Sequence, residues 1–329
     1  MNAVTQDAET VLVAGGGGFL GGHLVADLLS RGVRVRAVDI KPLDQWYQQH
    51  ETADNRVLDL RDPGQCATAT NGVARVFNLA CDMGGMGFIE LNKALCMRSV
   101  LINTHLLHAA LEAGVTRYFF ASSACVYKAE NQSSPDCAGL REDDVYPAAP
   151  EDGYGWEKLF SERMCRHYRE DFGLETRVAR LHGVYGPHGT YDGGREKAPA
   201  AICRKVAQAV LRGSGEIEIW GDGSQTRSFM FVDDFIEGLW RLEATEYSDP
   251  VNLGSAHMVS INELVDSVEE IAGTHLTRRY NLDAPKGVAG RNSDNTLIRS
   301  LTGWEPSTPL TDGLEITYRW IHDQIAAKT

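Results

Sequence analysis

A glycine-rich turn near the start of the chain constrains its fold more than any other feature. Residues 14–21 read AGGGGFLG, directly after the apolar segment Val11–Ala14 and before a proline-free segment with helical spacing. Two registers are possible, Gly16-x-Gly18-x-x-Gly21 and Gly15-x-x-Gly18-x-x-Gly21. Both leave bare backbone at a helix N-terminus, where amide N–H groups and the helix dipole favour an anion such as a pyrophosphate. The turn therefore predicts a strand, a phosphate-binding loop and a helix in succession.

Short apolar segments alternate with amphipathic ones, which is typical of parallel strands joined by crossover helices. The predicted strands are Val11–Ala14, Val33–Val38, Arg56–Leu58, Arg75–Asn78, Arg117–Ala121 and Thr176–Leu181. The predicted helices between them are Phe19–Ser30, Glu90–Ala113 and Gly153–Phe172. The fold class that follows is α/β, with a doubly wound parallel sheet of the Rossmann type and a smaller mixed α/β substrate domain.

We place the dinucleotide-binding domain at residues 8–185 and the substrate domain at residues 186–329. The boundary follows Tyr185, where the sequence changes to glycine, charge and loop. A segment near 229–256 is expected to return to the first domain. In the second part we expect a helix near Ala198–Leu211 and strands near Ile217–Ile219 and Phe229–Val232.

Composition and charge exclude several classes of protein. A net charge of −13 and a pI of about 5.2 argue against binding nucleic acid through its phosphates, which requires a basic surface. The seven cysteines are scattered and lack a Cys-x-x-Cys, so we expect reduced thiols and no metal site. No segment approaches the roughly 18 to 20 apolar residues of a membrane span, and the first ten residues do not resemble a signal sequence. We therefore expect a cytoplasmic protein.

A Tyr-x-x-x-Lys pair, Tyr154 and Lys158, follows the predicted strand that leads into Ser123 and Cys125. Lys158 lies one helical turn after Tyr154 and on the same face. Tyrosine alone is a poor base, with an ordinary pKa of about 10, so a neighbouring cation is needed to make it useful near neutral pH. A solvated helix face would explain such a pair in isolation. Together with the glycine turn, it indicates oxidation of an alcohol by a nicotinamide cofactor.

The carboxylate of Asp39, at the end of the second strand, indicates NAD as the cofactor rather than NADP. At this position a carboxylate accepts hydrogen bonds from the adenosine ribose and repels a 2′-phosphate, although a helix cap or turn is the alternative. Asp59 and Leu60 follow the third strand and are placed to meet the adenine, but a plain turn explains them nearly as well. The expected cofactor-binding residues are Gly15, Gly18, Phe19, Leu20, Gly21, Asp39, Asp59, Leu60, Tyr154 and Lys158.

Six segments, taken in order, resemble the extended short-chain dehydrogenase/reductase family, whose members act on nucleotide sugars. They read NLACDMGGMGFI at 78–89, ASSACVY at 121–127, YGWEK at 154–158, GGREKAPA at 193–200, WGDGSQTRSF at 220–229 and GRNSDN at 290–295. Within the family, these segments look most like enzymes that epimerise GDP-mannose at C3 and C5. The resemblance implies a nucleotide-sugar substrate, GDP-mannose, and a homodimer formed through the helices at Glu90–Ala113 and Gly153–Phe172.

The resemblance also implies a transient 4-ketone on the sugar. Tyr154, helped by Lys158, would take the proton of the 4-hydroxyl as hydride leaves C4 for NAD, while Ser123 holds the oxygen. The ketone acidifies the hydrogens on C3 and C5, which Cys125 and Lys197 would remove and replace from opposite faces of the ring. GDP-L-galactose and GDP-L-gulose would be the products. On spacing alone, Cys125 could equally be a small buried side chain and Lys197 a solvated charge.

The diphosphate of such a substrate needs cationic side chains in an acidic protein, and Arg227 and Arg291 are the best candidates. A surface strand position is the alternative for Arg227, and a helix cap for Ser293. Ordinary turn chemistry could account for the glycines at 84 and 85. The expected substrate-binding residues are Gly84, Gly85, Met86, Ser123, Lys197, Lys205, Gln225, Arg227, Arg291 and Ser293.

Two other functions stay open at this stage. A nucleotide-sugar 4-epimerase or dehydratase of the same family needs no acid or base at residue 125, so Cys125→Ala would not affect it. A regulator that senses the nicotinamide cofactor would turn over no sugar at all. The residue types needed for catalysis are all present, which favours an enzyme over a regulator: Tyr154, Lys158, Ser123 and Cys125.

Overall fold

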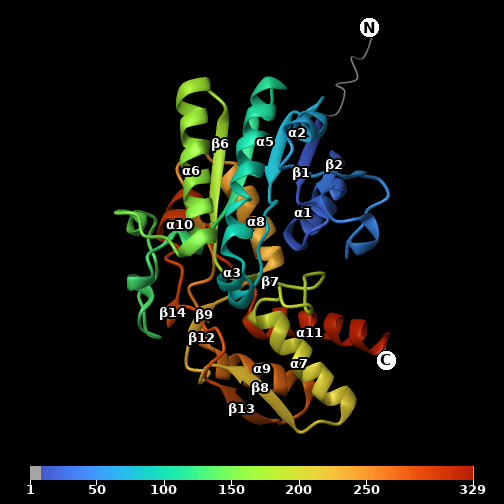
Figure 1. The fold of residues 1–329 in the computed structure, drawn as a ribbon, viewed down its shortest axis with the longest axis vertical. Helices are drawn as coiled ribbons and strands as arrows, with labels where there is room; N and C mark the ends of the chain where they lie inside the picture. Colours follow the sequence, from blue (N-terminus) through green and yellow to red (C-terminus); the bar gives the residue numbers. More distant parts are fainter. Residues whose placement is uncertain (1–8, 329) are drawn as a thin grey trace.

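The computed structural model describes residues 9–328 and is built around a central sheet (Figure 1). Within the described residues this sheet has seven strands in the order β11-β6-β5-β4-β1-β2-β3, and neighbouring strands are parallel. The strands are β1 (Thr10–Ala14), β2 (Arg34–Asp39), β3 (Asp54–Val57), β4 (Arg75–Asn78), β5 (Arg117–Ser123), β6 (Glu175–Leu181) and β11 (Val251–Leu253). The predicted α/β class with a doubly wound parallel sheet is confirmed.

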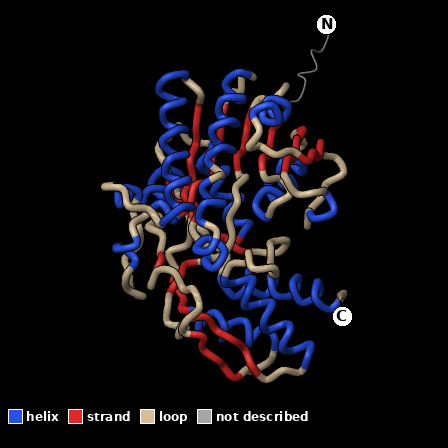
Figure 2. The backbone as a smooth tube through the Cα atoms, viewed as in Figure 1, coloured by secondary structure: helices blue, strands red, loops and turns tan. Residues whose placement is uncertain are grey.

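Helices cover both faces of the sheet (Figure 2). They are α1 (Phe19–Ser30), α2 (Pro63–Thr70), α5 (Val100–Glu112), α6 (Asp152–Phe172) and α8 (Val232–Glu243). Val11 and Val13 of β1 share an apolar cluster with α1 and α8, whereas Leu12 and Ala14 share one with α2, α5 and α6. Successive side chains of a strand point to opposite faces, so a strand buried on both sides must be apolar along its whole length.

The segment predicted as one helix, Glu90–Ala113, is divided into three helices, so that prediction is wrong in detail. They are α3 (Met86–Leu91), α4 (Lys93–Met97) and α5. Asn92 separates the first two because its backbone angles, φ −129° and ψ 41°, lie outside the helical region. The helix α2 is an unpredicted element, and the side chain of Asp62 caps it by accepting a hydrogen bond from the backbone N–H of Gln65.

Helical residues 93–112 are apolar and long enough to cross a membrane when judged by length and a mean hydropathy of 1.2. The prediction that no segment approaches such a span is therefore wrong for this one. In the structure 44% of the segment is buried, and α4 and α5 both pack against α6. These contacts are those of a core helix in a globular protein.

Short strands and helices form the rest of the described chain. The strands are β7 (Val184–Tyr185), β8 (Glu216–Trp220), β9 (Thr226–Ser228), β10 (Met230–Phe231), β12 (Met258–Ser260), β13 (Thr277–Asn281) and β14 (Gly290–Arg291). The helices are α7 (Ala198–Arg212), α9 (Ile261–Ala272), α10 (Thr296–Thr302) and α11 (Leu310–Ala326), with 3₁₀ turns η1 (Leu43–Gln45), η2 (Ala124–Val126), η3 (Ala129–Gln132) and η4 (Glu142–Val145). The predicted strand Phe229–Val232 is shorter than expected, because Val232 already begins α8.

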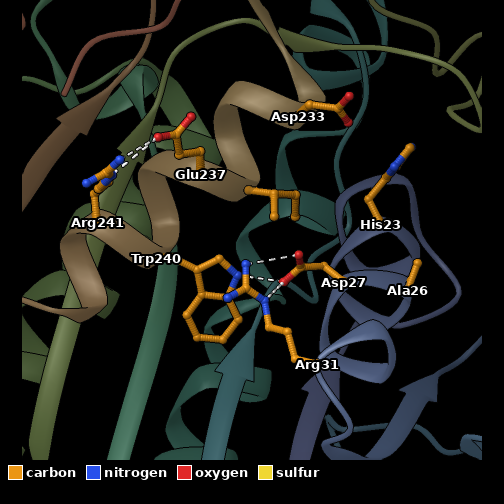
Figure 3. Close-up of a pocket in the computed structure, with 9 residues that line it drawn as sticks. His23, Ala26, Asp27, Arg31, Asp233, Glu237, Trp240 and Arg241 are labelled. Carbon is orange, nitrogen blue, oxygen red and sulfur yellow. Dashed lines mark hydrogen bonds and ion pairs between the residues drawn. The ribbon is translucent and has the colours of Figure 1, made fainter.

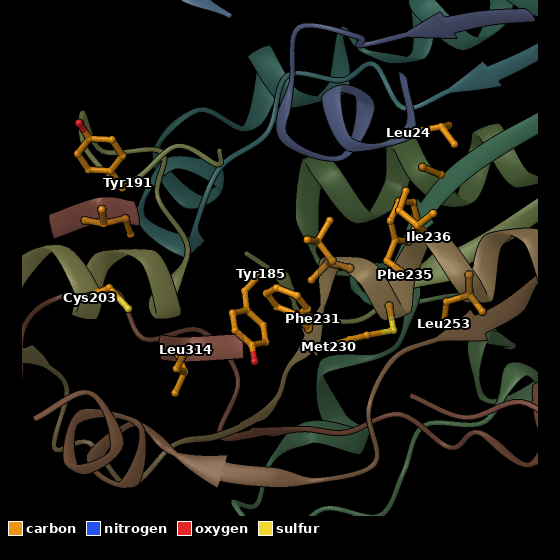
Figure 4. Close-up of a cluster of buried hydrophobic side chains, with 14 of the residues drawn as sticks. Leu24, Tyr185, Tyr191, Cys203, Met230, Phe231, Phe235, Ile236, Leu253 and Leu314 are labelled. Carbon is orange, nitrogen blue, oxygen red and sulfur yellow. The ribbon is translucent and has the colours of Figure 1, made fainter. Parts of the chain in front are cut away.

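One apolar cluster joins the two parts of the molecule, and Figure 4 shows a portion of it. Phe231 and Leu314 lie in this cluster together with residues of β1, α7 and α9. Inside the predicted return segment near 229–256, α8 packs on the sheet and β11 pairs with β6. The predicted domain start at residue 8, and most of the residues weighed as a signal sequence, lie outside the described residues.

A buried ion pair lies where α6 crosses β6. Arg180 donates to both carboxylate oxygens of Glu162 at 2.9 and 2.8 Å, and both side chains are less than 5% exposed. Ser122 also donates to Glu162, and Arg180 donates to the carbonyl oxygen of Glu142 at 2.8 Å. The bidentate geometry and the extra hydrogen bonds compensate for removing these charges from water.

Replacing Glu162 with Gln should lower the free energy of unfolding by about 3–5 kcal/mol, because the buried charge of Arg180 loses its partner. Urea unfolding followed by circular dichroism measures the change. Glu170→Gln is the matched control, since Glu170 pairs with Arg166 on the exposed side of the same helix and should leave stability nearly unchanged. Equal stability of the two variants would contradict the role given to the buried pair.

Candidate active site

The glycine-rich turn has the geometry that a dinucleotide needs. Gly15 has a φ of +84°, and a β-carbon added there would lie 3.0 Å from the backbone of Leu79 and Ala80. A β-carbon at Gly21 would lie 2.0 Å from the carbonyl oxygen of Gly15. Helix α1 begins directly after Gly18, and no side chain caps its N-terminus. Exposed amides at a helix N-terminus fit a pyrophosphate, so the residues present fit the predicted cofactor.

Asp39 closes β2 beside this turn, as predicted. Its Oδ2 lies 3.9 Å from the position that a β-carbon on Gly18 would occupy. Burial raises the pKa of the Asp39 carboxyl, and the positive charge of Lys41 lowers it by a smaller amount. The ammonium of Lys41 donates to the carbonyl oxygen of Gly17 at 2.6 Å. The ring of Trp46 covers Gly17, where a β-carbon would lie 2.3 Å from the ring. Neither Lys41 nor Trp46 carries a sequence signal for this position.

Asp59 and Leu60 follow β3, and both already have partners within the protein. Arg61 donates to the two carboxylate oxygens of Asp59 at 2.8 and 2.7 Å and holds the pKa of that carboxyl below its ordinary value. The side chain of Leu60 is 4% exposed and belongs to the apolar core. The Asp59 amide also donates to the side-chain oxygen of Gln65 at 2.7 Å, and the Leu60 carbonyl oxygen accepts from Cys66, so most of the main chain of this pair is engaged as well.

Tyr154 and Lys158 lie together at the N-terminal end of α6. Both are buried, and the lysine ammonium is 5.6 Å from the centre of the tyrosine ring. Lys158 donates to the carbonyl oxygen of Ala121 at 3.0 Å. Burial raises the pKa of Tyr154 well above its ordinary value, and a hydrogen bond with Ser123 acts in the opposite direction. The predicted Ser, Tyr and Lys residues are thus brought together.

The thiol of Cys125 lies in the same apolar cluster as Tyr154. Gly155 permits this approach, because a β-carbon there would lie 2.2 Å from the carbonyl oxygen of Cys125. The Cys125 amide donates to Ser123 Oγ at 3.2 Å. A guanidinium nitrogen of Arg291 is 3.5 Å from the Cys125 sulfur. The cysteine predicted as an acid or base therefore lies beside the predicted hydride-transfer residues.

Lys197 reaches this centre from the N-terminus of α7. Burial lowers the pKa of Lys197, and the neighbouring groups that act on it are Cys125 and Cys81. The loop before α3 holds the segment that precedes the lysine. The amide of Gly85 donates to the carbonyl oxygen of Arg195 at 3.0 Å, and a β-carbon on Gly85 would lie 2.4 Å from the oxygen of Glu196. The structure thus pairs an amine from one part of the chain with a thiol from the other.

The two arginines predicted to clamp a diphosphate are both engaged by the protein. Arg227 donates to the carbonyl oxygens of Thr226, Lys286 and Val288, and burial lowers its pKa to about 10. Arg291 donates to Gln132 at 2.6 Å and pairs with Glu151. Arg291 also lies 3.5 Å from the Cys125 sulfur, a contact that the sequence did not indicate.

The remaining predicted residues lie around β8 and β14. Lys205 donates to the carbonyl oxygen of Glu218 at 2.7 Å, with its ammonium 5.7 Å from the centre of the Trp220 ring. Gln225 donates to the carbonyl oxygen of Trp220 at 2.9 Å, and its own oxygen has no hydrogen-bond partner. Ser293 is buried and donates to Asn295 at 2.7 Å, so it does not cap α10. Met86 begins α3, directly after Gly84 and Gly85.

Two residues beside Tyr154 and Lys158 lie within the segments of the family resemblance but were not predicted as site residues. Cys81 follows β4 and hydrogen-bonds with both Tyr154 and Lys158. Glu157 is buried on α6 beside Lys158. No group of acidic, histidine or cysteine side chains among residues 9–328 is arranged to hold a metal ion.

A surface hollow of about 570 Å³ lies elsewhere, between α1 and α8 (Figure 3). Asp27, Arg31 and Trp240 line it, and Asp27 accepts hydrogen bonds from the other two. The hollow contains none of the predicted catalytic or substrate-binding residues. The candidate active site is therefore the group of side chains around Tyr154, and this hollow is not part of it.

Comparison with known proteins agrees with this geometry. The chain is 46% identical over 316 residues to GDP-mannose 3,5-epimerase 1 of Oryza sativa subsp. japonica, covering 96% of this chain and 82% of the relative. MoeE5 in complex with UDP-glucuronic acid and NAD has a similar structure, with a TM-score of 0.79, 30% identity and coverage of 96% and 99%. UDP-glucose 4-epimerase of Thermotoga maritima, at a TM-score of 0.85, 23% identity and the same coverage, supports the fold alone.

Residues 11–254 match the model of the NAD dependent epimerase/dehydratase family. The match spans more than half of the chain and contains the glycine turn, Asp39, Ser123, Cys125 and the Tyr154–Lys158 pair. The chain therefore belongs to the NAD dependent epimerase/dehydratase family.

Proposed function

We propose that the protein epimerises GDP-mannose at C3 and C5 through a transient 4-ketone. GDP-L-galactose is then the main product, and GDP-L-gulose, inverted at C5 alone, is the second. The observation that carries this proposal is the placement of Cys125 and Lys197 beside the Tyr154–Lys158 pair. A relative at 46% identity that bears the corresponding name supports the choice of GDP-mannose.

The oxidation step rests on Tyr154, Lys158 and Ser123. NAD, the cofactor of the family, provides the hydride acceptor and donor when it is bound at the glycine turn. Tyr154 takes the proton of the sugar 4-hydroxyl, and the hydroxyl of Ser123 holds the same oxygen. The positive charge of Lys158 stabilises the resulting tyrosinate, which burial alone would disfavour.

The epimerisation steps rest on Cys125 and Lys197. A carbonyl at C4 stabilises the carbanions at C3 and C5 as enolates, so each neighbouring C–H bond becomes acidic. One of the two side chains removes the proton and the other returns a proton to the opposite face. Burial lowers the pKa of Lys197, so a larger fraction of its amine is neutral near the working pH and able to accept a proton. The guanidinium of Arg291 lies 3.5 Å from the Cys125 sulfur.

With GDP-mannose in deuterated water, the protein should introduce deuterium at C5 and C3 of the recovered sugar, because each inversion exchanges a carbon-bound proton with solvent. Proton NMR of the nucleotide sugars measures the label at each carbon. UDP-glucose should acquire no label under the same conditions. Inversion at C4 without label at C3 and C5 would contradict the proposal and indicate a 4-epimerase.

Cys125→Ala should reduce deuterium incorporation at C3 and C5 by about 100-fold or more, the usual contribution of a positioned acid or base. The same NMR assay measures it. Cys203→Ala is the matched control, because that thiol is buried in the core of the substrate part, away from Tyr154. Unchanged incorporation in Cys125→Ala would remove the thiol from the mechanism.

We propose that the working form is a homodimer. Three large apolar side chains on α5 and α6 support this, because they are exposed in the single chain: Leu101 (39%), Trp156 (47%) and Phe160 (50%). Trp156 and Phe160 are four residues apart and share one face of α6. Figure 1 shows α5 and α6 side by side, and the two helices are in contact.

Phe160→Glu should convert the dimer to a monomer at micromolar concentration, because a charge replaces an apolar side chain on the proposed contact surface. Sedimentation velocity measures the mass. Phe172→Glu is the matched control, since Phe172 is 57% exposed at the far end of the same helix. A monomeric wild-type protein would contradict the dimer directly.

We also propose that the protein works in the cytoplasm. Support comes from its cysteines: all seven lie within residues 9–328 and none is joined in a disulfide. Free thiols are typical of a reducing compartment. Finding the native protein only in an extracytoplasmic fraction after cell fractionation would contradict this.

A further inference from the structure

The ammonium of Lys158 is buried in a way that requires a compensating anion. The side chain is 2% exposed. Its ammonium donates a hydrogen bond to the carbonyl oxygen of Ala121 at 3.0 Å and lies 4.7 Å from the centre of the Phe120 ring. A carbonyl and an aromatic face stabilise a cation only partly. A buried charge without an opposite charge costs several kcal/mol.

Glu157 supplies that anion. Its Oε2 lies 3.8 Å from the Lys158 ammonium, and its side chain is 1% exposed. Ser161 donates to the other carboxylate oxygen at 3.2 Å, whereas Oε2 has no hydrogen-bond partner. One carboxylate oxygen is therefore held by the hydrogen bond from Ser161, and the other is attracted by the positive charge of Lys158. Glutamate is seldom buried so completely without a pairing role.

The other titratable groups near the pair come from several elements and do not replace this carboxylate. They are Tyr154 and Cys165 on α6, Cys81 after β4, Cys96 on α4, Cys125 on η2 and Lys197 at α7. Burial disfavours charge on Lys158, yet Cys81 and Glu157 hold the pKa of the lysine above its ordinary value. Burial raises the pKa of both the Cys81 thiol and the Glu157 carboxyl, but the ordinary pKa of a carboxyl lies well below that of a thiol, so the negative charge beside Lys158 belongs to Glu157.

We infer that Glu157 is a positioning residue for the oxidation step, because its carboxylate balances the charge of Lys158 and thereby sets the pH range in which Tyr154 exchanges its proton. The inference rests on the proposed roles of Tyr154 and Lys158. Glu157 acts through Lys158 and is not itself a residue that contacts the sugar. It adds a fourth side chain to the Ser, Tyr and Lys group.

Glu157→Gln should make the Tyr154–Lys158 pair lose a proton at lower pH. The direction of this shift is the same whichever of the two residues loses the proton. Removing a nearby negative charge destabilises the protonated ammonium of Lys158, and it stabilises the ionised phenol of Tyr154. At a separation of about 4 Å and an effective dielectric constant of about 20, the displacement is on the order of one to three pH units. Glutamine keeps the shape and can still accept from Ser161.

Two readouts on the protein itself test this without any turnover of sugar. The absorbance of ionised tyrosine, taken as the difference from Tyr154→Phe, follows Tyr154, and carbon-13 NMR of the lysine side chains, assigned with Lys158→Met, follows Lys158. A displacement of either titration to lower pH supports the inference. Both titrations unmoved in a folded Glu157→Gln protein would overturn it.

Glu162→Gln is the matched control, because it removes a buried carboxylate from the same helix that pairs with Arg180 and not with Lys158. It should lose stability and leave both titrations unmoved. An equal displacement in Glu162→Gln would reduce the effect to general destabilisation and overturn the inference.

If Glu157→Gln does not fold, Glu157→Asp takes its place. The shorter side chain withdraws the carboxylate from Lys158, so the titration should be displaced in the same direction by less, and no displacement would overturn the inference. Failure of the GDP-mannose assay would leave these titrations interpretable, so the two proposals are tested separately.

Discussion

The active site depends on one close contact, between the first turn of α6 and the chain that leaves β5. The amide of Glu151 donates to the carbonyl oxygen of Cys125 at 2.9 Å, and Gly155 lies so close to that oxygen that a methyl group could not be accommodated. This contact fixes the distance between the end of the sheet and the helix that carries Tyr154. Since Ser123 and Cys125 are on one side and Tyr154 and Lys158 on the other, all four positions follow from it.

Charge balance is the second constraint on the structure. The chain is acidic, with a net charge of −13, yet it buries several cations at its centre. Arg180 is matched by Glu162, Arg291 by Glu151 and Lys158 by Glu157. A carboxylate beside each of these three cations keeps this part of the interior close to neutral, which is the condition under which buried ions are tolerated. Lys197 and Arg227 are matched less well, and burial lowers the pKa of each.

The two parts of the molecule meet at the reaction centre. The loop of Gly84 and Gly85 is pressed against residues 195–197, and the ring of Phe88 lies 3.9 Å below the guanidinium of Arg195. The amine of Lys197 is therefore brought to a site whose other residues lie at the end of β5, on η2 and on α6. Contacts between segments more than 100 residues apart thus place Lys197, the proposed partner of Cys125 in epimerisation.

The sequence alone determined the α/β class and the strand, turn and helix that hold the cofactor, because periodicity and glycine placement are local properties of the chain. It also predicted Tyr154, Lys158 and Ser123 from local spacing around one strand and one helix, whereas the role predicted for Cys125 came from the family resemblance. Only the tertiary structure decided the division of the segment 90–113 into three helices, the engagement of Arg227 and Arg291 by protein acceptors, and the burial of Glu157 beside Lys158. Those features arise from contacts between distant segments and from the cost of burying charge, which no pattern along the chain records.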